Sequence, residues 1–512
     1  MARAQQLFGV LRSPQPTITN RDGFPAYERP LREQYLQTVL TNNLGNTYYA
    51  DRDQLLDEAE AIHRQMIAQD ADFAAKALIY GRNEGLMRLQ PVLGLAVLAQ
   101  ARPDLFAQVF DRVALIPSDV QDFMTIIGGM GRGQGGRAVK RQVGKCVANL
   151  SEYHAIKYAG GGRGYTLADL IKTTHAKSAD PKQQALLAYL LGKGYDASLL
   201  PQIAEYEALK RADNDEDRVE HIRAGRLPHE VVTAVVQNPS AAVWDAILHE
   251  MPMFATLRML NALDRAGVLD ANRETISKRF SDAGALAKSK ILPFRFATAF
   301  EQVEKSWVKD VLRRAVDLSL GNLPDLPGAT SVMLDVSGSM RPGYGGGGDG
   351  VYTSYIALGA LFGLALWRKT NGDSPFLVFS DRAAEVAPST VDSILSQVDR
   401  IMHLPGGGTN TATPLELLLA KGKRVDTIIL ITDEQQNEGD RFHEVLNHYR
   451  HRVNRDVKTF VLDMAPYRSA VAPEGDKNVF YIYGWSDRVL PLIAMQLRGV
   501  ANQVSAVEAI DL

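Results

Sequence analysis

Two stretches, SVMLDVSGSM at residues 331–340 and TIILITD at residues 427–433, decide the fold of the C-terminal third of the chain. Each contains a short apolar run of the kind that forms a buried strand. Similar runs are PFLVFS (375–380), VKTFVLD (457–463) and NVFYIY (478–483), with helix-like stretches between or after them at 355–368, 414–419, 442–451 and 487–497. This alternation predicts a doubly wound α/β domain over residues 326–512, in which helices cover both faces of a parallel sheet.

Carboxylates and hydroxyls gather at the predicted strand ends. The first strand ends in a D-x-S-x-S motif, the third run ends in a carboxylate, and the glycine-rich loop PGGGTNT (405–411) supplies a threonine. The five residues are Asp335, Ser337, Ser339, Thr409 and Asp433. The carboxyl ends of parallel strands form the ligand crevice of such a sheet, so these side chains should converge. Because they are hard oxygen ligands, they predict a site for Mg²⁺ or Mn²⁺ rather than for zinc.

Other interpretations of this cluster are a metal-free loop of hydrogen-bonded hydroxyls and a hydrolase that uses the ion as a Lewis acid. Two further catalytic classes lack their motifs. The chain has no G-x-x-x-x-G-K-[ST] loop for nucleotide hydrolysis, and Ser337 does not lie in a G-x-S-x-G turn.

The part of the chain from about residue 30 to 305 has helical periodicity, with apolar residues such as Leu55, Ala59 and Ile62 on one stripe. Breaks recur every 15 to 25 residues at glycines and prolines. Many short helices with short links predict a helical-repeat scaffold, and a compact helical bundle is the alternative. The Pro/Gly-rich stretch GNLPDLPGAT (321–330) is the expected hinge to the α/β domain.

Composition limits the class of protein. The chain has 512 residues, a net charge of -2 and one cysteine, Cys146, so no intrachain disulfide can form. It has neither a signal-peptide pattern nor an apolar run of 18 residues, which predicts a cytoplasmic protein that does not span a membrane.

Positive charge is concentrated between Arg132 and Lys177. This stretch contains nine Lys or Arg residues and only two acidic residues, Glu152 and Asp169. Glycine-flanked arginines at 129–137 and 159–165 would let the backbone approach phosphates, which guanidinium groups bind. The rings available for stacking belong to His154, Tyr158, Tyr165 and His175. This pattern is typical of a surface for RNA or another polyanion, while the alternative is a solvated helix face.

These residues resemble the Ro autoantigen family, in which an RNA-binding TROVE domain precedes a von Willebrand factor A domain. The stretches that carry the resemblance are LGNTYYAD (44–51), YTLADLIKTTHAKS (165–178), HEMPMFATLRML (249–260) and ILPFRFATAF (291–300). The five strand-end residues are similar to the metal-ion-dependent adhesion site of A domains. There Ser337, Ser339 and Thr409 would bind the ion directly, and Asp335 and Asp433 largely through water. The chain departs from the family at 257–260 (LRML for L-R-N-L) and at 292–294 (LPF for H-P-F).

The resemblance implies a monomeric ring of HEAT-like helical repeats (residues 30–325), preceded by an extension (1–29) and closed by the A domain (326–512). Its outer surface would bind a small Y-like RNA, and its hole the single-stranded 3′ ends of misfolded RNAs. The residues that align with the Y RNA surface are Lys157, Arg163, Lys172 and His175. Charge adds Arg132, Arg137, Lys140 and Arg141, and the candidates for the inner ring are Arg258 and Arg295.

We therefore expect a non-catalytic RNA-binding protein of a small ribonucleoprotein, acting in RNA quality control or stress-linked RNA processing. Its bound RNA could tether a 3′-to-5′ exoribonuclease. The alternative function is a metal-dependent protein-binding module of the adhesion type, with the helical half as scaffold.

Overall fold

The computed structural model describes residues 14–41, 52–132, 135–160, 164–289, 291, 293–319, 326, 328–341, 351–370, 374–465, 467–473, 475–483 and 503–512. The chain forms two compact units. The sheet unit contains residues 1–90, 292–298 and 312–511, and the helical unit contains residues 91–291 and 299–311. The expected hinge lies mostly outside the described residues, as do the stretch at 44–51 and the helix expected at 487–497.

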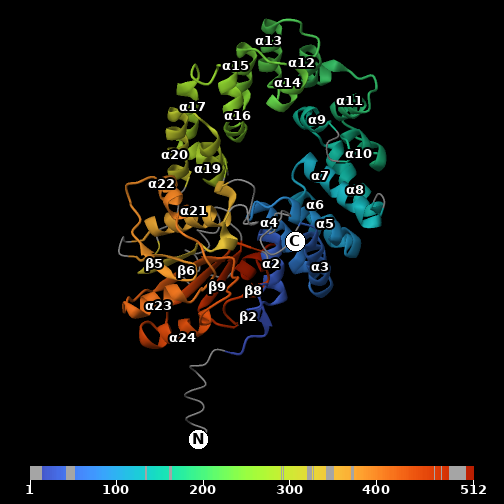
Figure 1. The fold of residues 1–512 in the computed structure, drawn as a ribbon. Coiled ribbons are helices and arrows are strands. Elements are labelled where there is room, and N and C mark those ends of the chain that lie inside the picture. The colour runs from blue at the N-terminus through green and yellow to red at the C-terminus, as the bar shows by residue number, and fades with distance from the viewer. Residues whose placement is uncertain are drawn as a thin grey trace. The chain divides into compact units, whose positions relative to one another are not determined.

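A six-stranded sheet is the centre of the sheet unit, with the order β5-β4-β3-β6-β7-β9. Figure 1 labels β5, β6 and β9 of this sheet. Its strands are β3 (Thr330–Asp335), β4 (Phe376–Phe379), β5 (Ala383–Val386), β6 (Thr427–Thr432), β7 (Lys458–Asp463) and β9 (Val479–Tyr483). All neighbours are parallel except β4 and β5. The five predicted strands are confirmed. The sequence analysis missed β5, a partly exposed edge strand without an apolar run.

Alternate residues of the central strands face two helical layers, as the predicted α/β class requires. Met333 of β3 belongs to the core with α23 (Thr413–Ala420) and α24 (Phe442–Arg452). Its neighbour Leu334 faces α21 (Tyr355–Arg368) on the other side of the sheet. Helix α22 (Ile394–Met402) packs against α21. A Cβ at Gly359 of α21 would lie 2.8 Å from Leu334, so glycine is needed for this close approach.

The N-terminal segment packs into the sheet unit. Strand β1 (Ile18–Thr19) pairs with β2 (Pro25–Glu28), which pairs with β8 (Ser469–Ala470), and α2 (Leu31–Thr41) contacts β9. The described part of the predicted N-terminal extension (residues 1–29) therefore contributes β1 and β2 to the sheet unit. The compact units also differ from the predicted boundary at 325/326, because residues 1–90 group with the C-terminal sheet. Short strands with long-range partners leave no local periodicity to read.

Three more helices belong to the sheet unit, namely α3 (Arg52–Gln69), α4 (Ala71–Asn83) and α26 (Gln503–Glu508). The helices at the two ends of the helical unit's sequence are shared between units, namely α5 (Leu89–Ala101), α19 (Pro293–Gln302) and α20 (Ser306–Ser319). No described helix is long and apolar enough to cross a membrane.

The helical unit is built from short helices that pack mainly on helices close to them in sequence, as in α10 on α8 or α13 on α12 and α15. They are α6 (Pro103–Val113), α7 (Pro117–Ile127), α8 (Gly136–Ala148), α9 (Glu152–Tyr158), α10 (Leu167–Thr174), α11 (Pro181–Leu190), α12 (Pro201–Leu209), α13 (Asp215–Gly225), α14 (His229–Val235), α15 (Ala241–Glu250), α16 (Met253–Arg265), α17 (Arg273–Ser281) and α18 (Ala283–Ser289). Several predicted breaks are helix starts, because proline at the first position lacks only an N–H that has no partner there.

We predict that His63 makes the stability of the sheet unit pH-dependent. This fully buried ring accepts from the Tyr35 hydroxyl at Nδ1 (2.9 Å) and donates from Nε2 to Gln90 Oε1 (3.1 Å), and burial lowers its pKa to about 4. The unfolded chain takes up this proton below about pH 6.5, so stability should fall by up to roughly 3 kcal/mol between pH 6.5 and 4. Urea unfolding at several pH values should show a smaller loss for His63→Gln than for wild type. The exposed His403→Gln serves as control, and equal losses in all three proteins would contradict this role.

Candidate metal centre and nucleic-acid interface

The five predicted metal residues are all buried in the sheet unit, with no side chain more than 4% exposed. Strands β3 and β6 are neighbours, so their carboxyl ends place Asp335 and Asp433 on the same edge of the sheet. Asp335 accepts hydrogen bonds from the Thr432 hydroxyl (2.6 Å) and the Ser337 amide (2.9 Å). The hydroxyls of Ser337 and Ser339 lie 3.3 Å apart.

Electrostatics at this cluster suit a cation. Burial and the carboxylate of Asp335 raise the pKa of Asp433 to about 8, which the Ser339 hydroxyl opposes. Burial also raises the pKa of Asp335. Oδ2 of Asp433 is buried and has no hydrogen-bond partner among the described residues. An uncompensated carboxylate pair with an unused oxygen is what a divalent ion would stabilise, so the residues fit Mg²⁺ or Mn²⁺.

Hydroxyl groups would have to complete the coordination. Within the described part of the chain, no group of three or more His, Cys, Asp or Glu residues could hold a metal ion. The Ser337 and Ser339 hydroxyls are oxygen donors near the two carboxylates. The Gly338 amide donates to the Gly407 carbonyl (3.2 Å), which brings the loop that contains Thr409 to the same strand ends. Small side chains leave room for water.

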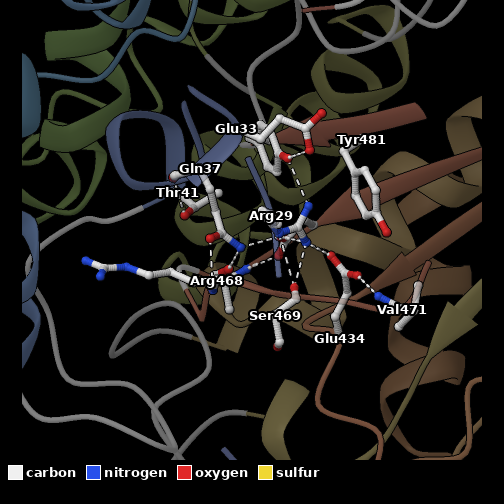
Figure 2. Close-up of polar contacts among 12 residues, drawn as sticks. Arg29, Glu33, Gln37, Thr41, Glu434, Arg468, Ser469, Val471 and Tyr481 are labelled. Carbon is white, nitrogen blue, oxygen red and sulfur yellow. Dashed lines mark hydrogen bonds and ion pairs between the residues drawn. The ribbon is translucent and has the colours of Figure 1, made fainter. Parts of the chain in front are cut away.

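Figure 2 shows a buried ion cluster that the sequence analysis missed, which includes Glu434, the residue after Asp433. The Arg29 guanidinium forms ion pairs with Glu434 and with Asp463, 2.9 Å away. It also donates to the Ser469 carbonyl (2.8 Å) and the Tyr483 hydroxyl (2.9 Å). Burial alone would lower the pKa of Arg29, but the nearby Glu434, Tyr483 and Asp463 side chains raise it. The guanidinium therefore stays charged. A strand-end aspartate, as in VKTFVLD, was the one sequence signal for this cluster.

Helices α8 and α10 of the helical unit pack together and carry most of the predicted RNA-binding charge. We call their Arg137, Lys140, Arg141, Lys145, Lys172, His175 and Lys177 the α8–α10 basic surface. All are exposed except the half-buried Lys140, and none forms an ion pair with a described residue. Arg137, Lys140, Arg141 and Gly144 recur at the spacing of one helix face, and the backbone of Gly144 lies against Thr174 of α10. The structure therefore brings residues of both helices onto one surface.

The other predicted contacts differ in their surroundings. Lys157 is half-buried and forms an ion pair with Glu230 (3.1 Å). Burial alone would raise the pKa of Glu230, but hydrogen bonds from His229 and Lys157 outweigh it and lower the pKa to about 2. Arg163 and the side chain of Arg132 lie outside the described residues.

The two arginines predicted for the inner ring, Arg258 and Arg295, are both exposed. They belong to different compact units. Arg258 of α16 lies over the Phe254 ring at 6.0 Å in the helical unit, and Arg295 of α19 belongs to the sheet unit. Among the rings expected to stack on bases, His154 is half-buried against Tyr158 at 5.9 Å, while His175 is exposed.

Comparison with known proteins identifies both halves. A family model for the TROVE domain matches residues 157–319, and one for the Ro60 vWA domain matches residues 330–495. An α-helical TROVE domain followed by an A domain defines the class of protein. The chain belongs to the Ro family.

Relatives of this class come from Deinococcus radiodurans. The chain is 24% identical over 477 residues to its RNA-binding protein RO60, covering 86% of this chain and 88% of the relative. The crystal structure of the D. radiodurans RO (RSR) protein has the same fold, with a TM-score of 0.65 and 22% identity over 85% of this chain and 93% of that one. The predicted family and fold classes are confirmed.

Proposed function

We propose that this protein binds a structured, Y-like small RNA through the α8–α10 basic surface, as part of a ribonucleoprotein in RNA quality control. The observation that carries the proposal is the set of exposed Lys and Arg residues on two packed helices that form no ion pair with another described residue. Cations that are not neutralised within the protein are free to replace the counterions of a phosphate backbone. The TROVE match and the RNA-binding name of the D. radiodurans relative support RNA as the partner.

Salt dependence tests the surface residue by residue. For Z phosphate contacts, the slope of log K against log [salt] should be about -0.7Z to -0.9Z. Lys172→Ala should reduce its magnitude by roughly one unit. His175→Asn should weaken binding without changing the slope, because a ring that stacks on a base does not displace phosphate counterions. Asparagine is chosen because His175 has φ of 52°, a conformation that asparagine tolerates.

Filter binding of a Y-like RNA at five salt concentrations gives these slopes. The matched control is Lys193→Ala, which alters an exposed lysine of the helical unit outside the basic surface. A control as defective as Lys172→Ala, or unchanged binding by both the Lys172 and His175 variants, would place the RNA elsewhere.

The proposal includes a second RNA mode, in which Arg258 and Arg295 bind the single-stranded 3′ end of a misfolded RNA. Backbone charge and base stacking tolerate any sequence, so a tailed hairpin should compete better than the same hairpin made blunt. The Arg258→Ala/Arg295→Ala double variant should lose this preference, and Arg265→Ala on the same helix as Arg258 should keep it. Equal affinity of wild type for both hairpins would eliminate the mode, and a preference kept by the double variant would eliminate these two arginines.

We further propose that Asp335, Ser337, Ser339, Thr409 and Asp433 bind Mg²⁺ or Mn²⁺, which would supply positive charge and an open coordination position for a partner's oxygen. Oδ2 of Asp433, which has no hydrogen-bond partner in the part of the chain that the structure describes, supports this role. The ion would stabilise the two carboxylates as anions, and the hydroxyls would fix its position at the strand ends.

Asp335→Ala should abolish binding of Mn²⁺ in isothermal titration, because it removes one of the two carboxylates. Asp426→Ala is the matched control. Asp426 directly precedes β6 and so lies at the amino end of the strand, whereas Asp433 lies at its carboxyl end. RNA affinity should stay within about twofold of wild type in both variants. Equal ion binding by wild type and Asp335→Ala would refute the site.

A further inference from the structure

The loop that follows β6, residues 433–438, connects two of the proposed metal residues. It begins at Asp433, and its Asn437 holds Thr409 from both sides. The Asn437 amide donates to the Thr409 carbonyl (2.9 Å), and the Thr409 amide donates to Asn437 Oδ1 (2.8 Å). Gln436 of the same loop accepts from the Thr411 hydroxyl (2.6 Å). The position of this loop therefore sets the distance between Asp433 and Thr409.

The turn between β1 and β2 holds this loop from the other end of the sequence. Asn20 Nδ2 donates to the Gln436 carbonyl (2.6 Å), and the Arg21 amide donates to Gln435 Oε1 (2.9 Å). Asn437 Nδ2 donates to Asp22 (3.1 Å). These contacts join residues more than 400 positions apart in the sequence.

Arg29 and Gln37 hold the start of the loop and the end of β7 (Figure 2). Glu434 follows Asp433 directly and has φ of 58°, a conformation that non-glycine residues rarely adopt. Its carboxylate is fixed on one side by Arg29 and on the other by the Val471 amide (2.8 Å). Gln37 donates to Asp463 and to the Ala465 carbonyl (3.1 Å).

The buried charges at the carboxyl ends of the strands also indicate that the metal centre depends on Arg29. Four carboxylates, those of Asp335, Asp433, Glu434 and Asp463, are no more than 2% exposed. Among the Lys and Arg side chains whose burial is described, Arg29 alone is buried. Burial of several anions beside one cation is unfavourable unless another cation is supplied. A divalent ion and Arg29 would share this task.

We propose that residues 20–37, from the β1–β2 turn to Gln37, are a structural part of the metal centre, so that docking of this segment and binding of the ion are thermodynamically coupled. The proposal rests on the proposed metal site. Undocking releases loop 433–438, which separates Asp433 from Thr409 and weakens ion binding. By linkage, the ion stabilises the docked segment by the same factor. Asn20, Arg29 and Gln37 are positioning residues, because they hold the loop or the neighbouring end of β7 and do not touch the ion.

Two variants separate positioning from net charge. Asn20→Ala removes a neutral contact, and Arg29→Lys keeps the charge but loses the fork of hydrogen bonds. Neither variant alters the net charge, so weaker ion binding would report the loss of positioning. Both variants should bind Mn²⁺ about fivefold or more weakly than wild type, which corresponds to one or two lost hydrogen bonds. Arg32→Ala is the control, since Arg32 of the same segment pairs instead with Asp70 and Glu508.

The reciprocal measurement uses the unaltered protein. Saturating Mg²⁺ should slow amide hydrogen exchange in residues 18–28. The slowing factor should be about equal to the factor by which undocking of the segment weakens ion binding. Mg²⁺ should have no effect on this exchange in Asp335→Ala. If wild type binds no divalent ion, both the proposed metal site and the proposed coupling are refuted. If wild type binds the ion but both variants match its affinity and exchange is unchanged, the coupling alone is refuted.

Discussion

Burial of negative charge at the carboxyl edge of the six-stranded sheet is the constraint on which the sheet unit depends. Ion pairs and hydrogen bonds must compensate buried anions, since an unpaired buried charge costs several kcal/mol. Arg29 supplies the one buried guanidinium in the described residues and contacts carboxylates more than 400 positions away. The N-terminal segment is consequently part of the C-terminal sheet unit.

The basic surface on α8 and α10 follows the opposite principle. Its cations are exposed apart from the half-buried Lys140 and form no ion pairs with other described residues, so their effect on folding is small. The same property makes them suited to a polyanion, because association with phosphates releases counterions. Lys157 shows the contrast within one region, since its ion pair with Glu230 must compete with any phosphate.

The proposed metal site and the α8–α10 basic surface lie in different compact units, which makes them separable by mutation. The proposed metal binding would depend on strand ends and loops of the sheet unit, and the proposed binding of a structured RNA on α8 and α10 of the helical unit. Changes at either site should leave the other intact unless the partners themselves connect them.

The sequence by itself determined the α/β class, five strands, the helical half and the convergence of Asp335 with Asp433, because apolar periodicity and strand-end residues are local patterns. It also located the basic residues of α8 and α10. Only the tertiary structure decided that α8 and α10 pack together, that β5 closes one edge, and that Arg29, Glu434 and Asp463 form one buried cluster. These features depend on contacts between distant segments, and a two-residue strand or a single arginine carries no periodic signal from which such a contact could be predicted.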